Sequence, residues 1–287
     1  MKGKIALLDY FDGKEAAALL IDGELHDFFA EPGANAPGSI FKVKVKHQIK
    51  GSGGIFVESP DGDFFLHKTK GITAGDVILV QVSSYGDREK LPRVTTKLLF
   101  KSRYVIVTPF NEGLNIAKNI QDNERRIQLK QLVVEGLDHI PYGMIMRSSC
   151  ASANKSEIIK DCKNTIMTAQ NVLSAEDKQM GLIHRAPSPH QLAWREWIDM
   201  PALDKTSGTF ADHGVLELID ELKHSKVILN NGNYYIEPTK AFVAIDVNTA
   251  GDISFAAGLK ANLAMAKDLP RQLRLRGLGG QIVVDPA

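Results

Sequence analysis

The stretch from residue 241 to residue 285 constrains the fold most, because it changes from a strand pattern to a helix pattern and back. Residues 241–245 form a short apolar run typical of a buried strand, and Asp246 follows it. Residues 258–276 have the periodicity of an amphipathic helix, with these apolar side chains on one face: Leu259, Leu263, Ala266, Leu269 and Leu273. Residues 281–284 predict a second strand, which ends at Asp285. A unit of this length predicts a right-handed crossover between two parallel neighbouring strands.

Asp246 and Asp285 are therefore expected side by side at the carboxyl ends of adjacent strands, where open α/β sheets bind ligands. Two neighbouring carboxylates repel each other and ionise together most easily around a cation. With oxygen ligands and no His or Cys nearby in the sequence, that cation should be hard, either Mg²⁺ or Mn²⁺. Asp252 is a candidate for an additional or supporting metal group. The alternative is that the aspartates cap loops or the following helix, as aspartates after strands often do.

The same stretch carries two longer sequence matches. Residues 245–252 (IDVNTAGD) and 269–285 (LPRQLRLRGLGGQIVVD) closely resemble the catalytic segment of the ribonuclease E/G family, which has similar runs in the same order. The resemblance implies that Asp246 and Asp285 hold a magnesium ion and that Asn248 orients the attacking water or the scissile phosphate. Basic side chains on the intervening helix either hold the RNA backbone or are solvated on its outer face: Lys260, Lys267, Arg271, Arg274 and Arg276.

Positive charge is concentrated in one segment, although the formal net charge of the 287-residue chain is only +1. Residues 37–110 contain twelve Lys and Arg against six Asp and Glu, so the remainder of the chain is net negative. No apolar run approaches the length of a membrane span, and the N-terminal apolar run is too short for a secretion signal. The two cysteines lack a CxxC spacing and are expected to be reduced thiols in a cytoplasmic protein.

Residues 37–110 predict about five short strands, the number in an OB-fold barrel. Such barrels bind single-stranded nucleic acid through basic grooves and through aromatic side chains on which bases stack. The candidates are Phe56 and Phe65 for stacking and Lys44, Lys90 and Arg93 for phosphates. The alternative is that the phenylalanines belong to the core and that the lysines form a solvated strand face. Residues 54–57 and 95–96 resemble the RNA-binding barrel of the ribonuclease E/G family.

Residues 111–182 predict two helices, at 122–134 with Asp122 as N-cap and at 156–173, on either side of a strand and turn at 143–149. In that turn, Arg147 offers a planar fork of donors and Ser148 a hydroxyl, which together favour an anion. Arg-Ser-Ser is also common in ordinary loops. The resemblance to the ribonuclease E/G family implies that Arg147 and Ser148 recognise an RNA 5′-monophosphate, with Ser148 in the place of a threonine.

The resemblance also implies a multi-subdomain α+β and α/β organisation. An OB-fold RNA-binding barrel (37–110) is inserted in a ribonuclease-H-like subdomain, of which 1–36 form the N-terminal hairpin and 183–240 the remainder. A 5′-phosphate sensor region (111–182) and the start of a deoxyribonuclease-like catalytic α/β subdomain (241–287) complete the chain. Because the family's catalytic subdomain continues further, we expect a short member of the family or a C-terminally truncated form, and the alternative is that the catalytic subdomain is degenerate. The family's zinc-linking cysteine motif is absent, so an oligomer would need another interface.

The sequence thus predicts a Mg²⁺-dependent endoribonuclease, a hydrolase that cuts single-stranded RNA in RNA processing or decay and senses 5′-monophosphates. One alternative is a non-catalytic RNA-binding protein that uses the same barrel and sensor. Another is a metalloenzyme acting on small nucleotides, which would not need the basic barrel.

Overall fold

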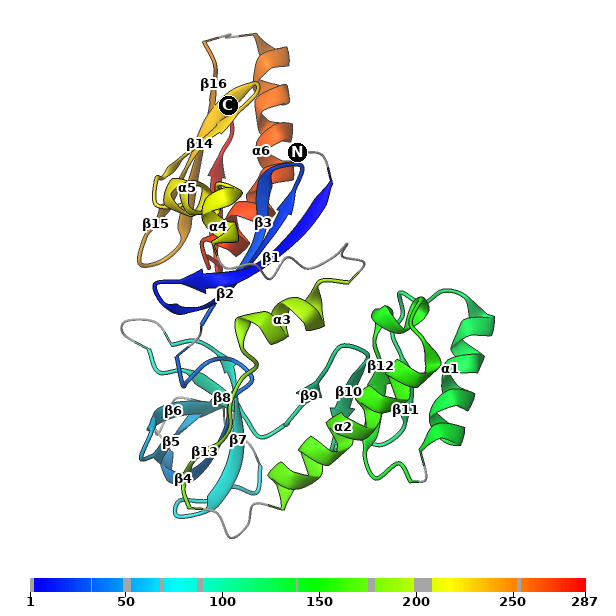
Figure 1. The fold of residues 1–287 in the computed structure, drawn as a ribbon. Coiled ribbons are helices and arrows are strands. Elements are labelled where there is room, and N and C mark those ends of the chain that lie inside the picture. The colour runs from blue at the N-terminus through cyan, green and yellow to red at the C-terminus, as the bar shows by residue number, and fades with distance from the viewer. Residues whose placement is uncertain are drawn as a thin grey trace. The chain divides into compact units, whose positions relative to one another are not determined.

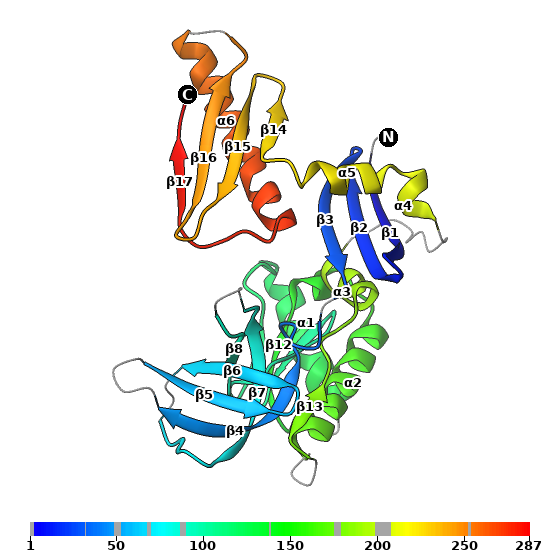
Figure 2. The same cartoon turned by 90° about the vertical axis from the view of Figure 1, so that its left-hand side faces the viewer.

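The computed structural model describes residues 3–31, 33–48, 53–67, 70–86, 90–137, 139–174, 179–198, 208–251 and 254–287. The chain forms two compact units, each shown in Figures 1 and 2. The central unit consists of residues 32–198, and the terminal unit combines residues 1–31 with residues 199–287. No helix among the described residues is both long enough and apolar enough to cross a membrane.

The central unit contains an OB-like barrel of five strands, as the sequence predicted for residues 37–110. The strands are β4 (Ile40–Gln48), β5 (Gly54–Ser59), β6 (Gly62–His67), β7 (Val77–Ser84) and β8 (Arg93–Thr95). They pair in the order β4-β5-β6-β8-β7, β7 pairs back to β4, and β8 runs parallel to β6. Alternate side chains fill the barrel, so its core is formed by one face of each strand, including Phe41, Val43, Ile55, Val57 and Phe64.

A second sheet and two long helices also belong to the central unit. The sheet has the order β11-β12-β10-β9, with β9 (Phe100–Lys101), β10 (Val105–Thr108), β11 (Leu114–Ile116) and β12 (Gly143–Met146). The predicted helices are α1 (Asn123–Gly136) and α2 (Lys155–Leu173), and between them lies the short 3-10 helix η1 (Ser148–Ala151). Asp122 caps α1, since its carboxylate accepts hydrogen bonds from the amides of Glu124 and Arg125 at 2.9 and 3.2 Å.

The boundary expected at residue 183 differs from the structure. Strand β13 (Gly181–His184) pairs with β4 of the barrel, and α3 (Pro189–Glu196) follows it. Residues 183–198 therefore belong to the central unit rather than to the same body as residues 208–240. Pairing across more than 130 residues gives no local sequence signal, so the sequence alone did not show that residues 183–198 continue the central unit.

The terminal unit begins with a three-stranded meander of β1 (Lys4–Phe11), β2 (Lys14–Ile21) and β3 (Glu24–Ala30). Two short helices, α4 (Thr209–Asp212) and α5 (Val215–Glu221), contribute Phe210 and Val215 to its core. The buried Asp9 carboxylate accepts hydrogen bonds from the amides of Gly208 (3.1 Å) and Phe210 (3.0 Å). Burial alone would raise the pKa of Asp9, but these amide donors outweigh it, and the pKa is lowered.

The second sheet of the terminal unit contains the predicted strand–helix–strand unit. Its order is β14-β15-β16-β17, with β14 (Lys226–Leu229), β15 (Gly232–Pro238), β16 (Val243–Thr249) and β17 (Ile282–Asp285). The parallel pairing of β16 with β17 confirms the expected neighbours. Helix α6 (Phe255–Leu275) packs on one face of this sheet (Figure 1). The side chains of Val243, Ile245 and Val247 meet Ala261 and Met265 there.

Two details of this prediction were wrong. Strand β16 continues to Thr249, so Asp246 lies within the strand and not after its end. The expected apolar face of the helix also holds only in its C-terminal half, where Leu269 and Leu273 pack against the sheet. In the N-terminal half, Leu259 and Leu263 are 54% and 55% exposed, because Ala261 and Met265 face the strands instead.

Candidate functional site

Asp246 and Asp285 lie next to each other on one face of the terminal sheet. They are direct register partners on the parallel strands β16 and β17, which are neighbours in Figure 2. Hydrogen-bonded strands lie about 4.8 Å apart, and register partners project from the same face. Since Val243, Ile245 and Val247 point toward α6, the two carboxylates occupy the opposite face, where both are exposed. The sequence therefore placed these two residues together correctly, although their role is a separate question.

Asn248 joins this pair from the same strand. It lies two residues beyond Asp246 and so projects from the same face. Its side-chain amide donates a hydrogen bond to Asp246 Oδ2 at 2.8 Å. The amide thus fixes the orientation of one carboxylate, which is a role that can coexist with contact to a phosphate or water.

The donor set fits a hard cation better than a transition metal. Among the residues that the structure describes, no group of three or more His, Cys, Asp and Glu could enclose a metal ion. Mg²⁺, however, keeps several waters and is commonly held by one or two carboxylates together with a substrate phosphate. Two exposed carboxylates in register therefore suit Mg²⁺. Asp252, the further candidate, lies outside the described residues.

The aromatic and basic candidates of the barrel form a row on its outer surface. Phe56 on β5 pairs with Phe65 on β6, and Phe65 pairs with Arg93 on β8. The two rings meet edge to face with centroids 6.2 Å apart. Both phenylalanines are half-buried and point away from the core, in which Phe64 is fully buried. The interpretation of Phe56 and Phe65 as core residues is therefore not supported by their position.

The other two barrel candidates lie outside this row. Lys44 on β4 is exposed and is the register partner of Glu58 on β5. Glu58 lies two residues beyond Phe56 and projects from the same face. Lys90 is exposed and lies three residues before Arg93. Sequence analysis missed His67, whose exposed ring contacts Phe65 edge to face at 5.4 Å. Its position two residues after Phe65 in an alternating strand was the signal that could have revealed it.

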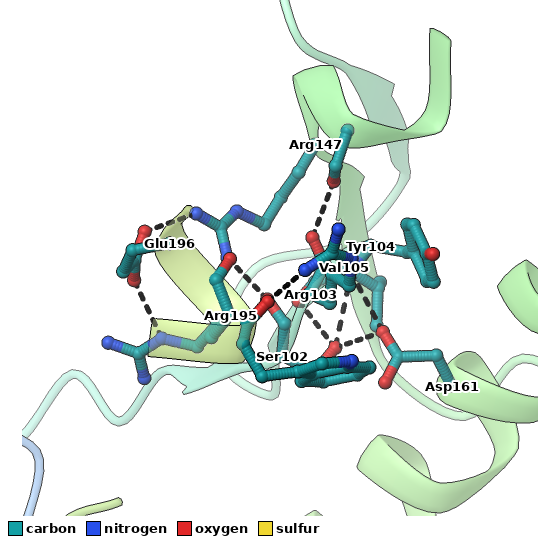
Figure 3. Close-up of polar contacts among 10 residues, drawn as sticks. Ser102, Arg103, Tyr104, Val105, Arg147, Asp161, Arg195 and Glu196 are labelled. Carbon is teal, nitrogen blue, oxygen red and sulfur yellow. Dashed lines mark hydrogen bonds and ion pairs between the residues drawn. The ribbon is translucent and has the colours of Figure 1, made fainter. Parts of the chain in front are cut away.

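The predicted phosphate sensor, Arg147, is engaged by other groups of the central unit (Figure 3). Its Nη2 lies 2.6 Å from Glu196 Oε2, and its Nη1 donates to the carbonyls of Ser102 and, at 3.4 Å, Arg195. The Arg147 side chain is 17% exposed. Ser148 is exposed at the start of η1, whereas the next serine, Ser149, is buried and donates to the carbonyl of Arg103.

Glu196, at the end of α3, was missed by sequence analysis. Its second oxygen lies 2.6 Å from Arg195 Nε, so the carboxylate bridges two guanidinium groups. Burial alone would raise the pKa of Glu196, but the hydrogen bond and charge of Arg147 and the charge of Arg195 lower it below its usual value. The carboxylate is therefore ionised at neutral pH and occupies the donors that an anionic ligand of Arg147 would use.

Around this cluster the central unit is basic and partly open. Arg103 stacks on Trp194 of α3, with 5.3 Å from its guanidinium carbon to the ring centroid. A cavity of about 590 Å³ lies beside it, and Lys97, Lys101, Arg195 and Asp161 are among the residues that line the cavity. The Asp161 carboxylate accepts hydrogen bonds from the amide of Tyr104 (2.9 Å) and the hydroxyl of Ser102.

The arginines of α6 have structural partners within the terminal unit. Arg271 donates to the carbonyl of Leu25 at 3.0 Å and Arg274 to that of His26 at 2.6 Å. Arg276 donates to two carbonyls in the segment between α5 and β14, at 2.7 and 2.8 Å. These contacts tie α6 to the rest of the unit, a third possibility beside RNA binding and solvation. Lys260 and Lys267 are exposed.

The fold and the site together define a mixed α+β protein with an OB-like barrel and a pair of carboxylates suited to Mg²⁺. The sequence profile of the ribonuclease E/G family matches residues 100–206 and 198–286. The chain belongs to the ribonuclease E/G family.

Relatives across bacteria agree with this assignment. The chain is 24% identical to ribonuclease E of Nostoc sp. over 94% of its length, and 26% identical to ribonuclease G of Haemophilus influenzae over 97%. Ribonuclease G of Escherichia coli is 23% identical over 86% of the chain. The chain spans 48% of the Nostoc protein, 70% of the Haemophilus protein and 63% of the Escherichia protein.

Proposed function

We propose that this chain provides the barrel and the metal-binding carboxylates of a Mg²⁺-dependent endoribonuclease that cuts single-stranded RNA. The observation that carries the proposal is the in-register pair of Asp246 and Asp285 on an exposed sheet face. The ribonuclease names of the relatives support RNA as the substrate, and we propose RNA processing or decay in the cytoplasm as the setting. We also propose the subdomain roles expected from the sequence, with the barrel as the RNA-binding part and residues 241–287 as the catalytic part.

The two aspartates and Asn248 would have different roles at the metal site. Asp246 and Asp285 would hold Mg²⁺, and Asn248 keeps the Asp246 carboxylate oriented through its 2.8 Å hydrogen bond. Bound Mg²⁺ supplies a Lewis acid that polarises a phosphoryl oxygen and lowers the pKa of a bound water. The open face leaves room for an RNA strand above the carboxylates. Attack by water on the phosphate would leave 3′-hydroxyl and 5′-phosphate ends.

A cleavage assay tests the proposal. The protein is incubated with a 5′-monophosphorylated, single-stranded RNA of about a dozen nucleotides, a length that suits OB-fold binders. We expect internal cuts in Mg²⁺ and none in EDTA. Binding without cuts in Mg²⁺ would contradict the nuclease proposal and support the non-catalytic alternative. Equal activity on mononucleotides would point to a small-molecule enzyme.

The aromatic row of the barrel is proposed to bind RNA bases. Replacing Phe56 and Phe65 together by alanine should weaken binding of single-stranded RNA by about 1–3 kcal/mol for each base that stacks there. Fluorescence anisotropy with labelled RNA in EDTA measures the change. Phe56→Leu with Phe65→Leu is the matched control, because leucine keeps apolar cover without a ring for stacking. If the double alanine variant binds as tightly as the wild type, the row is not a stacking surface.

The region around Arg147 is proposed to sense a 5′-monophosphate, with the phosphate replacing Glu196. Arg147 is already paired, so a phosphate must compete with the Glu196 carboxylate for the same guanidinium. The basic cavity beside the cluster would admit the RNA 5′ end.

Glu196→Gln is therefore expected to increase the preference for 5′-monophosphate over 5′-hydroxyl RNA about threefold to fivefold, since a partly exposed ion pair is worth up to about 1 kcal/mol. Arg147→Ala should abolish the preference. Competition binding with the two RNAs measures both effects, and Arg195→Gln is the control for loss of a charge beside Glu196. A lower preference in Glu196→Gln would mean that Glu196 positions Arg147 for the phosphate instead of competing with it.

A further inference from the structure

The open face of the terminal sheet carries one charged or aromatic side chain from each of its four strands in a single row. Register pairs run from Lys226 on β14 to Tyr235 on β15, from Tyr235 to Asp246 on β16, and from Asp246 to Asp285 on β17. Because register partners project from the same face, all four side chains lie opposite α6. The row therefore places an aromatic ring beside the carboxylate pair and a cation one strand further away.

Tyr235 lies outside the hydrophobic core of the sheet. Its neighbour Tyr234 points to the other face, is fully buried, and donates its hydroxyl to Asp268 Oδ2 at 2.7 Å. Tyr235 is half-buried on the open face, and Lys226 Nζ lies 5.8 Å from its ring centroid. This distance is within the range of a cation–π contact, so the lysine and the ring form one surface.

We propose that Tyr235 and Lys226 form a nucleotide subsite next to the cleavage position, a proposal that rests on the function proposed above. Neighbouring strands are about 4.8 Å apart, so Tyr235 is one strand spacing from Asp246 and Lys226 is two. With the scissile phosphate at the carboxylate pair, the adjacent base stacks on Tyr235 and the next phosphate meets Lys226. Stacking accepts any base because every base has a π-face, so the subsite holds single-stranded RNA without fixing its sequence.

The charges along the row favour the scissile phosphate at the carboxylate pair, where a cation would bind, and the next phosphate at Lys226. A phosphate would be repelled by Asp246 and Asp285 unless a cation lies between them, whereas Lys226 attracts a phosphate directly. The Tyr235 ring lies between the carboxylate pair and Lys226, next to the nucleoside that connects the two phosphates. Duplex RNA would not expose a base for the ring, so the subsite selects single strands.

The test separates a nucleotide subsite from simple cover of the sheet. Four variants of the full 287-residue chain are compared: Tyr235→Val, Tyr235→Phe, Lys226→Gln and, as the control, Tyr10→Val. Valine keeps strand propensity without an aromatic ring, and phenylalanine keeps the ring. Tyr10 is an exposed tyrosine on β1 of the same unit, so Tyr10→Val reports the cost of losing any surface tyrosine there. Thermal unfolding confirms that each variant is folded.

Binding of a labelled twelve-nucleotide RNA is measured in EDTA, so that metal-dependent cleavage does not enter. Tyr235→Val should weaken binding at least about fivefold, as expected for one stacked base, while Tyr235→Phe and Tyr10→Val change it less than about twofold. Lys226→Gln should weaken binding by a smaller factor and reduce its salt dependence by about one phosphate contact. In Mg²⁺, Tyr235→Val should raise KM more than it lowers kcat. Wild-type affinity and wild-type KM in Tyr235→Val would overturn the subsite.

Failure of the subsite can be told apart from failure of the proposed function. If the wild type cuts RNA and Tyr235→Val binds and cuts like it, the subsite is wrong and the nuclease proposal stands. If the wild type does not cut RNA but Tyr235→Val still loses affinity in EDTA, the nuclease proposal fails and the binding subsite stands.

Discussion

Replacing either Asp246 or Asp285 by asparagine is expected to lower Mg²⁺-dependent cleavage of single-stranded RNA by about a thousandfold. A metal bound at the reacting phosphate supplies several kcal/mol of charge stabilisation, and each 1.4 kcal/mol corresponds to a factor of ten in rate. Asparagine keeps the shape of the side chain but halves the charge that the pair offers to a cation. The initial rate of cutting at saturating RNA is the appropriate measurement.

The exposed position of Asp246 and Asp285 separates an effect on cleavage from an effect on folding. Both side chains are exposed, so the substitutions should leave the free energy of unfolding almost unchanged. Glu237→Gln is the matched control, because Glu237 is an exposed carboxylate on β15 that projects from the same face. It should cut at the wild-type rate. Binding of Mn²⁺, followed by electron paramagnetic resonance, should weaken in both aspartate variants and not in the control. Wild-type cutting by either aspartate variant would exclude the pair as the metal site.

Much of this fold could be predicted from local patterns. The alternation of apolar and polar residues marked the five barrel strands, and the strand–helix–strand pattern marked β16, α6 and β17. Predicting parallel neighbours was sufficient to bring Asp246 and Asp285 to one face, although not to find that they are direct register partners. The helix face was harder to predict. Periodicity selected Leu259 and Leu263, but the packing against the sheet uses Ala261 and Met265, which lie on a neighbouring face of the same helix.

The partners of charged side chains were beyond local patterns. Arg147 and Glu196 are 49 residues apart, and Arg271 and the carbonyl of Leu25 are 246 residues apart. An arginine in a basic run has the same local sequence whether its guanidinium meets a phosphate, water or a backbone carbonyl. Only the folded chain shows that Arg271, Arg274 and Arg276 bind carbonyls. The arginine-rich run is therefore evidence for the family but not, by itself, for an RNA-binding helix.

Arg271 provides the strongest test of whether an arginine of this run binds RNA or stabilises the fold. Its guanidinium contacts Asp268 at 2.6 Å and the carbonyl of Leu25 at 3.0 Å, and Asp268 also accepts the hydroxyl of the buried Tyr234 at 2.7 Å. The Arg271 and Asp268 side chains are only 20% and 14% exposed. Arg271→Ala would remove one of the two hydrogen-bonding partners that Asp268 has among the described residues, and it would leave the Leu25 carbonyl without this donor. We expect a loss of about 2–4 kcal/mol in the free energy of unfolding.

Because the chain forms two compact units, the loss in the free energy of unfolding can be assigned to one of them. Both tryptophans, Trp194 and Trp197, lie in the central unit, so their fluorescence follows that unit during urea unfolding, while far-UV circular dichroism follows both. Arg271→Ala should move the circular dichroism transition to lower urea and leave the fluorescence transition in place. Arg271→Lys should recover only part of the loss, because an ammonium cannot reproduce the planar fork. Arg274→Ala is the control, since Arg274 is 52% exposed and should cost less than about 1 kcal/mol.

RNA binding by the same variant then decides between structure and function. If Arg271 acts through its contacts with Asp268 and Leu25, Arg271→Ala should bind RNA with wild-type affinity at a temperature where it is fully folded. If Arg271 holds a phosphate, the affinity should fall at that temperature and its salt dependence should decrease by about one contact. The hydrogen bonds favour the first outcome, because a guanidinium committed to a carboxylate and a carbonyl has few donors left for an RNA strand. In that case the basic run stabilises the helix that precedes Asp285, and it supports cleavage only by keeping β17 beside β16.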